Sequence, residues 1–286
     1  MKRILITGGS GMLGRALVRE WTGHAILFPV SSGQLDLRDA AAVGDAVRRL
    51  APSVILHTAA YTNVDGAEGA PEDAAAVNDR GTAHLAVAAA ACGATLVYVS
   101  TDYVFDGTKG APYLEDDPCR PINVYGRTKL AGEGHARGVP HHRIVRTQGL
   151  FGRDGKSFVA SILAAADAGR AISVVDDVTT GVTYAADLAH ALRLLVEAEA
   201  EGTFHACNLG PVVWNEFARA ILSEAGREDV PVARTTSAAS GRAARRPASS
   251  YLDTSRYAAT VGESLPPWRD ALRRHLRDVL PRPAGA

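Results

Sequence analysis

The sequence begins with Lys2-Arg3-Ile4-Leu5-Ile6-Thr7, which runs directly into Gly8-Gly9-Ser10-Gly11-Met12-Leu13-Gly14. This order predicts an apolar strand, a glycine-rich turn and a helix over residues 12–21. A strand that turns sharply into a helix presents unbonded backbone N–H groups and the positive end of the helix dipole to a phosphate. Glycine allows the tight turn and the close approach of the phosphate. The stretch therefore predicts a dinucleotide site, although glycine-rich turns also occur as plain connecting loops.

Apolar runs rich in β-branched residues then alternate with alanine-rich helical stretches. Strands are predicted at residues 24–30, 54–60, 95–100 and 143–147, and helices at 40–50, 71–92 and 124–137. Strands that are apolar throughout are typical of a parallel sheet covered on both faces. Right-handed crossovers wind such a sheet in both directions and place its ligand at the carboxyl ends of the strands. We therefore expect an α/β fold with a doubly wound, Rossmann-type parallel sheet.

The pattern is less regular beyond residue 147. Helices are predicted at 157–169, 185–198, 214–226 and 267–280, and strands at 172–175 and 204–209. Residues 1–147 are expected to form the dinucleotide-binding domain, with 182–210 returning to it. Residues 148–181 and 211–286 are expected to form a smaller C-terminal substrate-binding region. Within it, residues 230–255 are rich in Ala, Arg, Ser and Pro, which predicts a linker or a mobile loop whose basic residues face an anion.

Composition excludes several classes of function. The 286 residues include 31 Lys and Arg against 31 Asp and Glu, so no net basic charge favours nucleic-acid binding. Cys92, Cys119 and Cys207 lie far apart without CxxC spacing, as is typical of a reduced cytosolic protein without structural zinc. No signal peptide and no apolar run of membrane-spanning length are expected. We expect a cytoplasmic protein that binds no metal, no nucleic acid and no membrane.

Two further segments carry groups suited to catalysis. Ser100-Thr101-Asp102 ends a predicted strand, and Tyr125-Gly126-Arg127-Thr128-Lys129 is a YxxxK motif. The motif places Tyr125 and Lys129 one helical turn apart, where the ammonium is expected to lower the pKa of the phenol. The pair would then act as a general acid and base, with the Thr101 or Ser100 hydroxyl holding a carbonyl. The Tyr and Lys of a lone YxxxK motif most often lie on the protein surface without a catalytic role. The prediction therefore depends on the combination of this motif with the glycine turn.

Three longer runs give a closer resemblance. They are 59–68 (AAYTNVDGAE), 100–107 (STDYVFDG) and 121–133 (PINVYGRTKLAGE), and the tail run 246–254 (RPASSYLDT) joins them. Together they resemble the dTDP-4-dehydrorhamnose reductase family of extended short-chain dehydrogenases/reductases. The resemblance implies reduction of the 4-keto group of a nucleotide-linked 6-deoxy sugar, most simply dTDP-4-dehydro-L-rhamnose to dTDP-L-rhamnose.

The resemblance also assigns residues. It implies that Thr101, Tyr125 and Lys129 are catalytic, with Tyr125 protonating the alkoxide and Lys129 also binding the nicotinamide ribose. The residues expected to bind the cofactor are Gly8, Ser10, Gly11, Met12, Leu13, Asp36, Leu37, Ala59, Ala60, Tyr61, Ser100, Tyr125 and Lys129. Those expected to bind the substrate are Asp102, Tyr103, Gln148 and Arg246. The expected partner is a nucleotide sugar, and a homodimer is left open.

Two departures concern the sugar pocket. Gly149 stands where the family usually has a tryptophan that helps to cover the sugar, and 180–183 (TGVT) replaces the usual Gly-x-Pro-Thr. The identity of the 4-keto sugar is therefore open, with a sugar of secondary metabolism as an alternative. The cofactor is expected to be NADPH rather than NADH, because Val30-Ser31-Ser32-Gly33 ends the second strand without an acid that would bind the ribose hydroxyl.

Two other functions remain as alternatives. Close relatives of the family act as a non-catalytic regulatory subunit of methionine adenosyltransferase, but such a subunit has no need of a tyrosine tuned by a lysine. An epimerase or a dehydratase uses the same scaffold. Dehydration would require an acid pair next to the hydroxyl residue, whereas Asp102 and Tyr103 follow Thr101.

Overall fold

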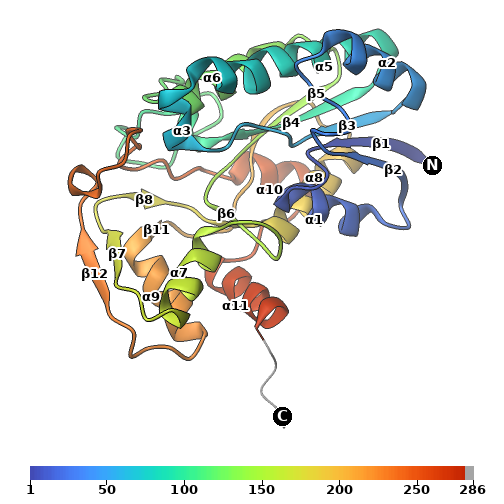
Figure 1. Ribbon diagram of the computed structural model, residues 1–286. Coiled ribbons are helices and arrows are strands. Elements are labelled where there is room, and N and C mark those ends of the chain that lie inside the picture. The colour runs from blue at the N-terminus through green and yellow to red at the C-terminus, as the bar shows by residue number, and fades with distance from the viewer. Residues whose placement is uncertain (281–286) are drawn as a thin grey trace.

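The computed structural model describes residues 1–280, and its centre is a parallel sheet of six strands (Figure 1). The strands lie in the order β2-β1-β3-β4-β5-β10. The chain passes from β1 to β2 on one side and then returns to β3 on the other, so the winding direction changes between β1 and β3. Ligands of doubly wound sheets bind at this point. The predicted doubly wound α/β fold is confirmed.

The strands of the sheet are β1 (Lys2–Thr7), β2 (Ala25–Val30), β3 (Val54–His57), β4 (Thr95–Thr101), β5 (His142–Thr147) and β10 (Gly202–His205). The helices up to β5 are α1 (Met12–Trp21), α2 (Ala40–Leu50), α3 (Val64–Gly69), α4 (Pro71–Ala75), the π-helical η1 (Ala76–Arg80), α5 (Gly81–Cys92), the 3-10 turn η2 (Asp102–Val104) and α6 (Val124–Arg137). Later helices are α7 (Phe158–Asp167), α8 (Ala185–Glu197), α9 (Trp214–Glu224), η3 (Ala238–Ser240), α10 (Ser255–Val261) and α11 (Trp268–Val279). Later strands are β6 (Leu150–Phe151), β7 (Ile172–Val175), β8 (Thr179–Thr180), β9 (Thr183–Tyr184), β11 (Val212–Val213) and β12 (Val232–Thr235).

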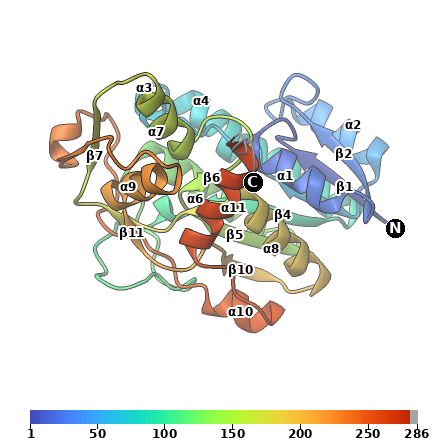
Figure 2. The same cartoon turned by 90° about the horizontal axis from the view of Figure 1, so that it is seen from below.

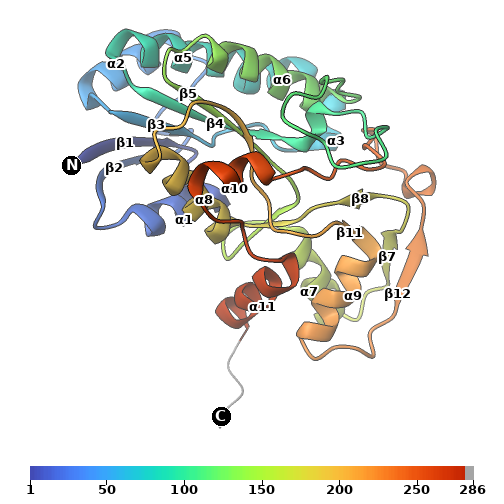
Figure 3. The ribbon, with the colours of Figure 1, turned by 180° about the vertical axis from the view of Figure 1, so that it is seen from behind.

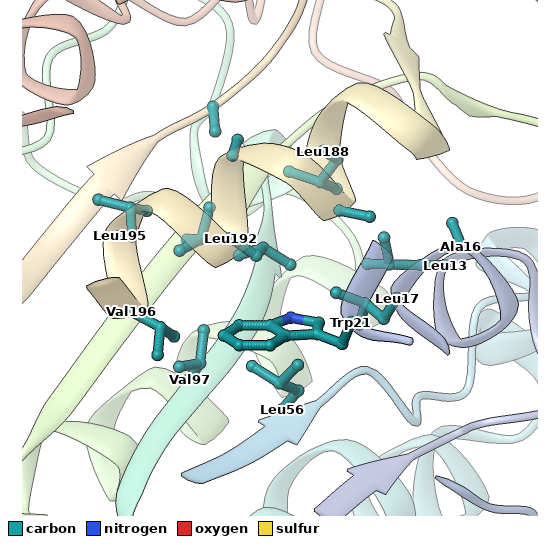
Figure 4. Close-up of a cluster of buried hydrophobic side chains, with 14 of the residues drawn as sticks. Leu13, Ala16, Leu17, Trp21, Leu56, Val97, Leu188, Leu192, Leu195 and Val196 are labelled. Carbon is teal, nitrogen blue, oxygen red and sulfur yellow. The ribbon is translucent and has the colours of Figure 1, made fainter. Parts of the chain in front are cut away.

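Helices cover both faces of the sheet because its strands are apolar on both sides. Leu5 packs toward α2, α5 and α6, whereas Ile4 and Ile6 pack toward α1 and α8. Figures 1 and 3 show these two helical layers on opposite sides of the strands. In the lower layer, the Trp21 ring fills the space between α8 and the sheet (Figure 4). This packing fixes the carboxyl end of α1, opposite the end that follows the glycine turn.

A smaller cluster of helices lies beyond the carboxyl ends of the strands (Figures 1 and 2). It packs α7, α9 and α11 with the parallel pair β7–β12, around aromatic residues such as Phe217 and Trp268. In contrast, Tyr257 of α10 joins the apolar cluster of the main sheet. The division of the chain into two domains stays a prediction.

Several predicted elements differ from the structure. Helix 71–92 contains the π-helical turn η1, because the buried Asn78 side chain bonds the backbone of Tyr61 and the Thr128 hydroxyl. The predicted strand 54–60 ends at residue 57, and 204–209 is replaced by 202–205. The linker interpretation of 230–255 is wrong. That segment contains β12 and η3, and bridges at Ser249 and Leu252 attach it to the rest of the molecule.

Candidate active site

A cavity of about 1630 Å³ lies between the carboxyl ends of the sheet and the smaller helical cluster. Its lining includes the glycine turn after β1, the loop after β3, the end of β4 and the start of α6. Residues of α7, β7 and the segment 235–246 form the opposite wall. The cavity therefore reaches from the glycine turn to the smaller helical cluster, and the predicted catalytic groups are part of its lining.

The glycine turn forms a cradle for an anion. Gly8 has a φ of +70°, and a Cβ atom there would lie 2.8 Å from the Ala59 nitrogen. A Cβ atom at Gly14 would lie 2.2 Å from the Gly8 carbonyl oxygen. Helix α1 begins after Gly11 with no side-chain cap and no acid in its first turn. Its first N–H groups face the cavity at Met12 and Leu13, which suits a pyrophosphate.

The predicted contacts at the adenosine end are only partly brought together. Ser32, Ala59, Ala60 and Tyr61 line the cavity, whereas Asp36 and Leu37 do not. The exposed Asp36 carboxylate bonds Arg38 at 2.7 Å, and this hydrogen bond lowers the pKa of Asp36 to about 2. Leu37 is buried, and its carbonyl oxygen contacts His84 Nδ1 at 2.8 Å. Cofactor contact at residues 36 and 37 stays a prediction.

The three predicted catalytic residues all line this cavity. Thr101 ends β4, and α6 carries Tyr125 and Lys129 in its first turns. Asn123 fixes the start of α6, since its side chain accepts the Gly126 N–H at 2.7 Å. The Lys129 ammonium donates to the Val99 carbonyl oxygen at 2.7 Å and lies 4.0 Å from the Tyr98 ring centre. Local helix capping and sheet geometry together place this trio.

Burial dominates the electrostatics of the trio. It lowers the pKa of Lys129 to about 7, against the opposing effect of the Glu133 charge. Burial also raises the pKa of Tyr125, against a smaller opposing contact with Thr101. The expectation that Lys129 lowers the pKa of Tyr125 is therefore wrong for this arrangement. The phenol keeps its proton at neutral pH, which is the form that a proton donor needs.

The hydroxyl of Ser100 is engaged in a buried ion-pair network. Its hydroxyl donates to Glu133 Oε1 at 2.6 Å, although the residue lines the cavity. Arg146 binds both oxygens of the same carboxylate at 2.8 Å, and both side chains are at most 1% exposed. This ion pair ties α6 to β4 and β5. Of the two hydroxyls considered in the sequence, that of Thr101 is the one that contacts the Tyr125 phenol.

The predicted substrate residues all line the cavity, but three of them have polar groups already bonded within the protein. Gln148 donates to the Thr180 hydroxyl at 3.0 Å and accepts the Leu252 N–H at 2.9 Å. Arg246 binds the carboxylate of Asp65 at 2.7 and 3.0 Å. These side chains hold the cavity wall in place.

Tyr103 contacts Tyr125, and Asp102 contacts Thr101. The ring of Tyr103 meets that of Tyr125 edge-on, with centres 6.0 Å apart. Asp102 accepts hydrogen bonds from the hydroxyls of Thr101 and Ser250. The Asp102 carboxyl is thus already bonded within the protein, like the Gln148 amide and the Arg246 guanidinium.

Comparisons with known proteins agree with this geometry. The family model described as the RmlD substrate binding domain matches residues 1–280. The chain belongs to this family. A relative from Streptomyces griseus, named dTDP-4-dehydrorhamnose reductase, is 43% identical and aligns over 94% of this chain and 91% of its own. The relative of the same name from Salmonella typhimurium is 35% identical, with coverages of 97% and 98%.

Solved structures extend the comparison to three dimensions. The dTDP-4-dehydrorhamnose reductase of Bacillus anthracis in complex with NADP superposes with a TM-score of 0.94 at 35% identity, covering 97% of this chain and 99% of that one. A UDP-glucose 4-epimerase of Thermus thermophilus in complex with NAD has a TM-score of 0.84 at 21% identity, covering 97% and 100%. The latter likeness concerns the fold alone.

The departure of this RmlD-family chain at Gly149 has a structural reason. Gly149 has a φ of +54°, and a Cβ atom there would lie 2.5 Å from the Gly181 carbonyl oxygen. A Cβ atom at Gly181 would in turn meet the Gln148 amide at 2.9 Å. The chain segments around Gly149 and Gly181 approach too closely for a side chain, so no indole can occupy position 149 without a backbone shift.

Sequence reasoning missed the aromatic wall of the cavity. Phe158 and Trp214 line it, with ring centres 4.7 Å apart and planes at 61°. The only signal in the sequence was that Trp214 starts one predicted helix and Phe158 is the second residue of another. Arg242 and Arg245 also line the cavity, in line with the anion-facing interpretation of 230–255.

The described residues offer no grouped metal ligands. Within residues 1–280, no three His, Cys, Asp or Glu side chains gather as ligands of one ion would. Over the same range, no helix has the length and apolar character needed to cross a bilayer.

Proposed function

We propose that the protein reduces the 4-keto group of dTDP-4-dehydro-L-rhamnose to give dTDP-L-rhamnose, using NADPH. The main support is that Thr101, Tyr125 and Lys129 line the same cavity as the glycine cradle and the opposite wall. Membership of the RmlD family supports this substrate. The lack of an acid after β2, where Ser32 borders the cavity, supports NADPH, because no carboxylate there would repel a 2′-phosphate.

Each of the three residues has a separate role in the proposed reaction. The bound nicotinamide would supply the hydride that C4 of the sugar receives. Tyr125 gives its phenolic proton to the keto oxygen, which becomes the new hydroxyl. Thr101 donates a hydrogen bond to the same oxygen and thereby orients the carbonyl. Lys129 has three N–H donors and uses one on Val99, so the others can hold the ribose beside the phenol.

Loss of nicotinamide absorbance with enzymatically generated dTDP-4-dehydro-L-rhamnose tests this function. We expect the wild type to oxidise NADPH and Tyr125→Phe to lose about 10²–10⁴-fold in kcat, because the general acid is gone. The control is the dissociation constant for NADPH, which the variant should keep. Tight NADPH binding by a wild type that reduces no keto sugar would instead favour the regulatory-subunit alternative.

A second candidate is a reductase of another dTDP-linked 4-keto sugar. The close contact of Gly149 with Gly181 favours it, because this chain lacks the ring that covers the sugar in the family. A panel of 4-keto sugars that differ at C2 and C3 distinguishes the two. The larger kcat/KM identifies the substrate.

Two further proposals concern the location of the enzyme in the cell and its oligomeric state. A cytoplasmic location is supported by the free thiols of Cys92, Cys119 and Cys207. A homodimer is tested by light scattering of the purified protein, where a monomeric mass would contradict it.

A further inference from the structure

Asp102 is a buried acid next to the catalytic threonine. It is 3% exposed, and it forms the first residue of the turn η2 that follows β4. Its Oδ1 accepts the Thr101 hydroxyl at 3.1 Å, and its Oδ2 accepts the Ser250 hydroxyl. Among the described residues, no cation forms a salt bridge with it within 4.0 Å. Within residues 1–280, the side chains that donate hydrogen bonds to this carboxyl are two neutral hydroxyls.

This arrangement uses the only proton of the Thr101 hydroxyl. A hydroxyl donates one hydrogen bond and accepts up to two. Thr101 Oγ1 already accepts the Tyr103 N–H at 3.2 Å, and its proton points to Asp102. In this state Thr101 has no proton to donate to a keto oxygen beside Tyr125.

We propose that Asp102 is a positioning residue that acts as a neutral acid: it donates its proton to Thr101 Oγ1, so that Thr101 donates its own proton to the keto oxygen. This inference rests on the proposed reductase function. Ser250 holds the other carboxyl oxygen and so couples the segment 244–253 to the catalytic threonine. The carboxylate takes up this proton from solvent. After that no covalent bond is broken, because the hydrogen bond between Thr101 and Asp102 reverses its direction and the Thr101 proton turns to the keto oxygen.

The surroundings of Asp102 favour the neutral form. Burial raises its pKa to about 7, against the weaker opposing effects of the Ser250 and Thr101 hydrogen bonds. The titratable groups that act on it from neighbouring elements are the phenols of Tyr103 and Tyr125 and the thiol of Cys207, none of which is cationic. The positioned state is thus populated below about pH 7 and lost as the pH rises through that value.

Substitutions of Asp102 test the inference through the pH profile of kcat/KM. Asp102→Asn keeps the shape and cannot ionise, whereas Asp102→Leu keeps only the bulk. In the wild type, the ionisations of Asp102 and Lys129 both shape the alkaline limb of the profile. We expect Asp102→Asn to lose the first of these ionisations and to keep that of Lys129. We expect Asp102→Leu to lose about 10²-fold in kcat with an unchanged dissociation constant for NADPH. Asp116→Asn, whose carboxyl side chain is 80% exposed, is the matched control and should keep the wild-type profile.

An infrared titration reads the same proton without turnover. The C=O band of a carboxylic acid should be present in the wild type below neutrality and absent in Asp102→Asn. Ser250→Ala should move the titration of this band to higher pH, because the carboxylate loses a donor, and Ser250→Thr should restore it. An unchanged alkaline limb in Asp102→Asn, or the absence of the band, would overturn the role of Asp102. A wild type that shows the band but reduces no keto sugar would overturn the proposed function instead.

Discussion

Lys129 illustrates how a single residue can be placed for chemistry at the expense of stability. Its ammonium is 2% exposed, and its hydrogen-bond partner is the Val99 carbonyl oxygen. Burial lowers its pKa from 10.5 to about 7, so the folded protein disfavours the charged form. Active sites commonly keep such groups because the reaction needs them.

Lys129→Met should therefore abolish reductase activity and stabilise the protein. Between about pH 7 and 10.5 the unfolded state holds a proton that the folded state lacks, so the stability of the wild type rises with pH in this window. The variant has no such rise. We expect it to exceed the wild type by on the order of 3 kcal/mol in unfolding free energy below neutrality, with the gap closing toward alkaline pH. Urea unfolding across this range measures the gap, and a less stable variant near neutrality would contradict the prediction.

At the scale of elements, α6 is held to the sheet by one buried ion pair. Glu133 lies one turn beyond Lys129 and binds Arg146 of β5 through both oxygens. Burial alone would raise the pKa of Glu133, but the hydrogen bonds and charge of Arg146 lower it below the usual value. The stability that this carboxylate contributes is present above its unfolded pKa and is lost as the pH falls through the folded value.

Arginines on the two sides of Glu133 provide a matched comparison. Arg146→Met leaves a buried carboxylate without its main partner and should cost about 3–5 kcal/mol of unfolding free energy. Arg137→Ala removes a partner that is 43% exposed and should cost less than about 1 kcal/mol. Chemical denaturation of both variants near neutral pH gives the comparison. Equal losses would mean that burial does not decide the strength of these pairs.

A comparison of the predicted and observed helices shows which of them local sequence can predict. Helices 40–50 and 124–137 were predicted with their observed bounds, because their polar caps Asp39 and Asn123 are local signals. The π-helical turn η1 could not be predicted, since it depends on the bonds of Asn78 to the loop after β3 and to α6. Helix α3 was missed because it is short and its sequence, VDGAEG, is rich in glycine.

At the scale of the whole molecule, the site is assembled from parts far apart in the chain. The grouping of the glycine turn with Thr101, Tyr125 and Lys129 in one cavity could be predicted, because each depends on a short motif, whereas their roles stay predictions. The hydrogen bonds that occupy Arg246 and Gln148 were not predicted, since their partners Asp65 and Thr180 are distant in the sequence. Long-range pairing of polar groups is the part of this site that local patterns do not encode.

Binding of the dinucleotide should stabilise the folded molecule as a whole. NADPH at about 100 times its dissociation constant adds about 2.7 kcal/mol to the unfolding free energy. Gly8→Ala should abolish this gain, because its Cβ atom would lie 2.8 Å from the Ala59 nitrogen within the cradle. Gly23→Ala is the control: Gly23 also has a positive φ, of +84°, but a Cβ atom there meets nothing within 4 Å. Thermal melting with and without NADPH measures both, and equal stabilisation of the two variants would argue against the cradle.

The segment 244–253 has a consequence for the newly made chain. It supplies Arg246, which binds Asp65, and Ser250, which bonds Asp102 beside the catalytic threonine. All six strands of the sheet precede it in the sequence. A chain growing on the ribosome therefore exposes the whole dinucleotide half before the last wall of the active site exists. Catalytic competence is among the last properties that the protein acquires during its synthesis.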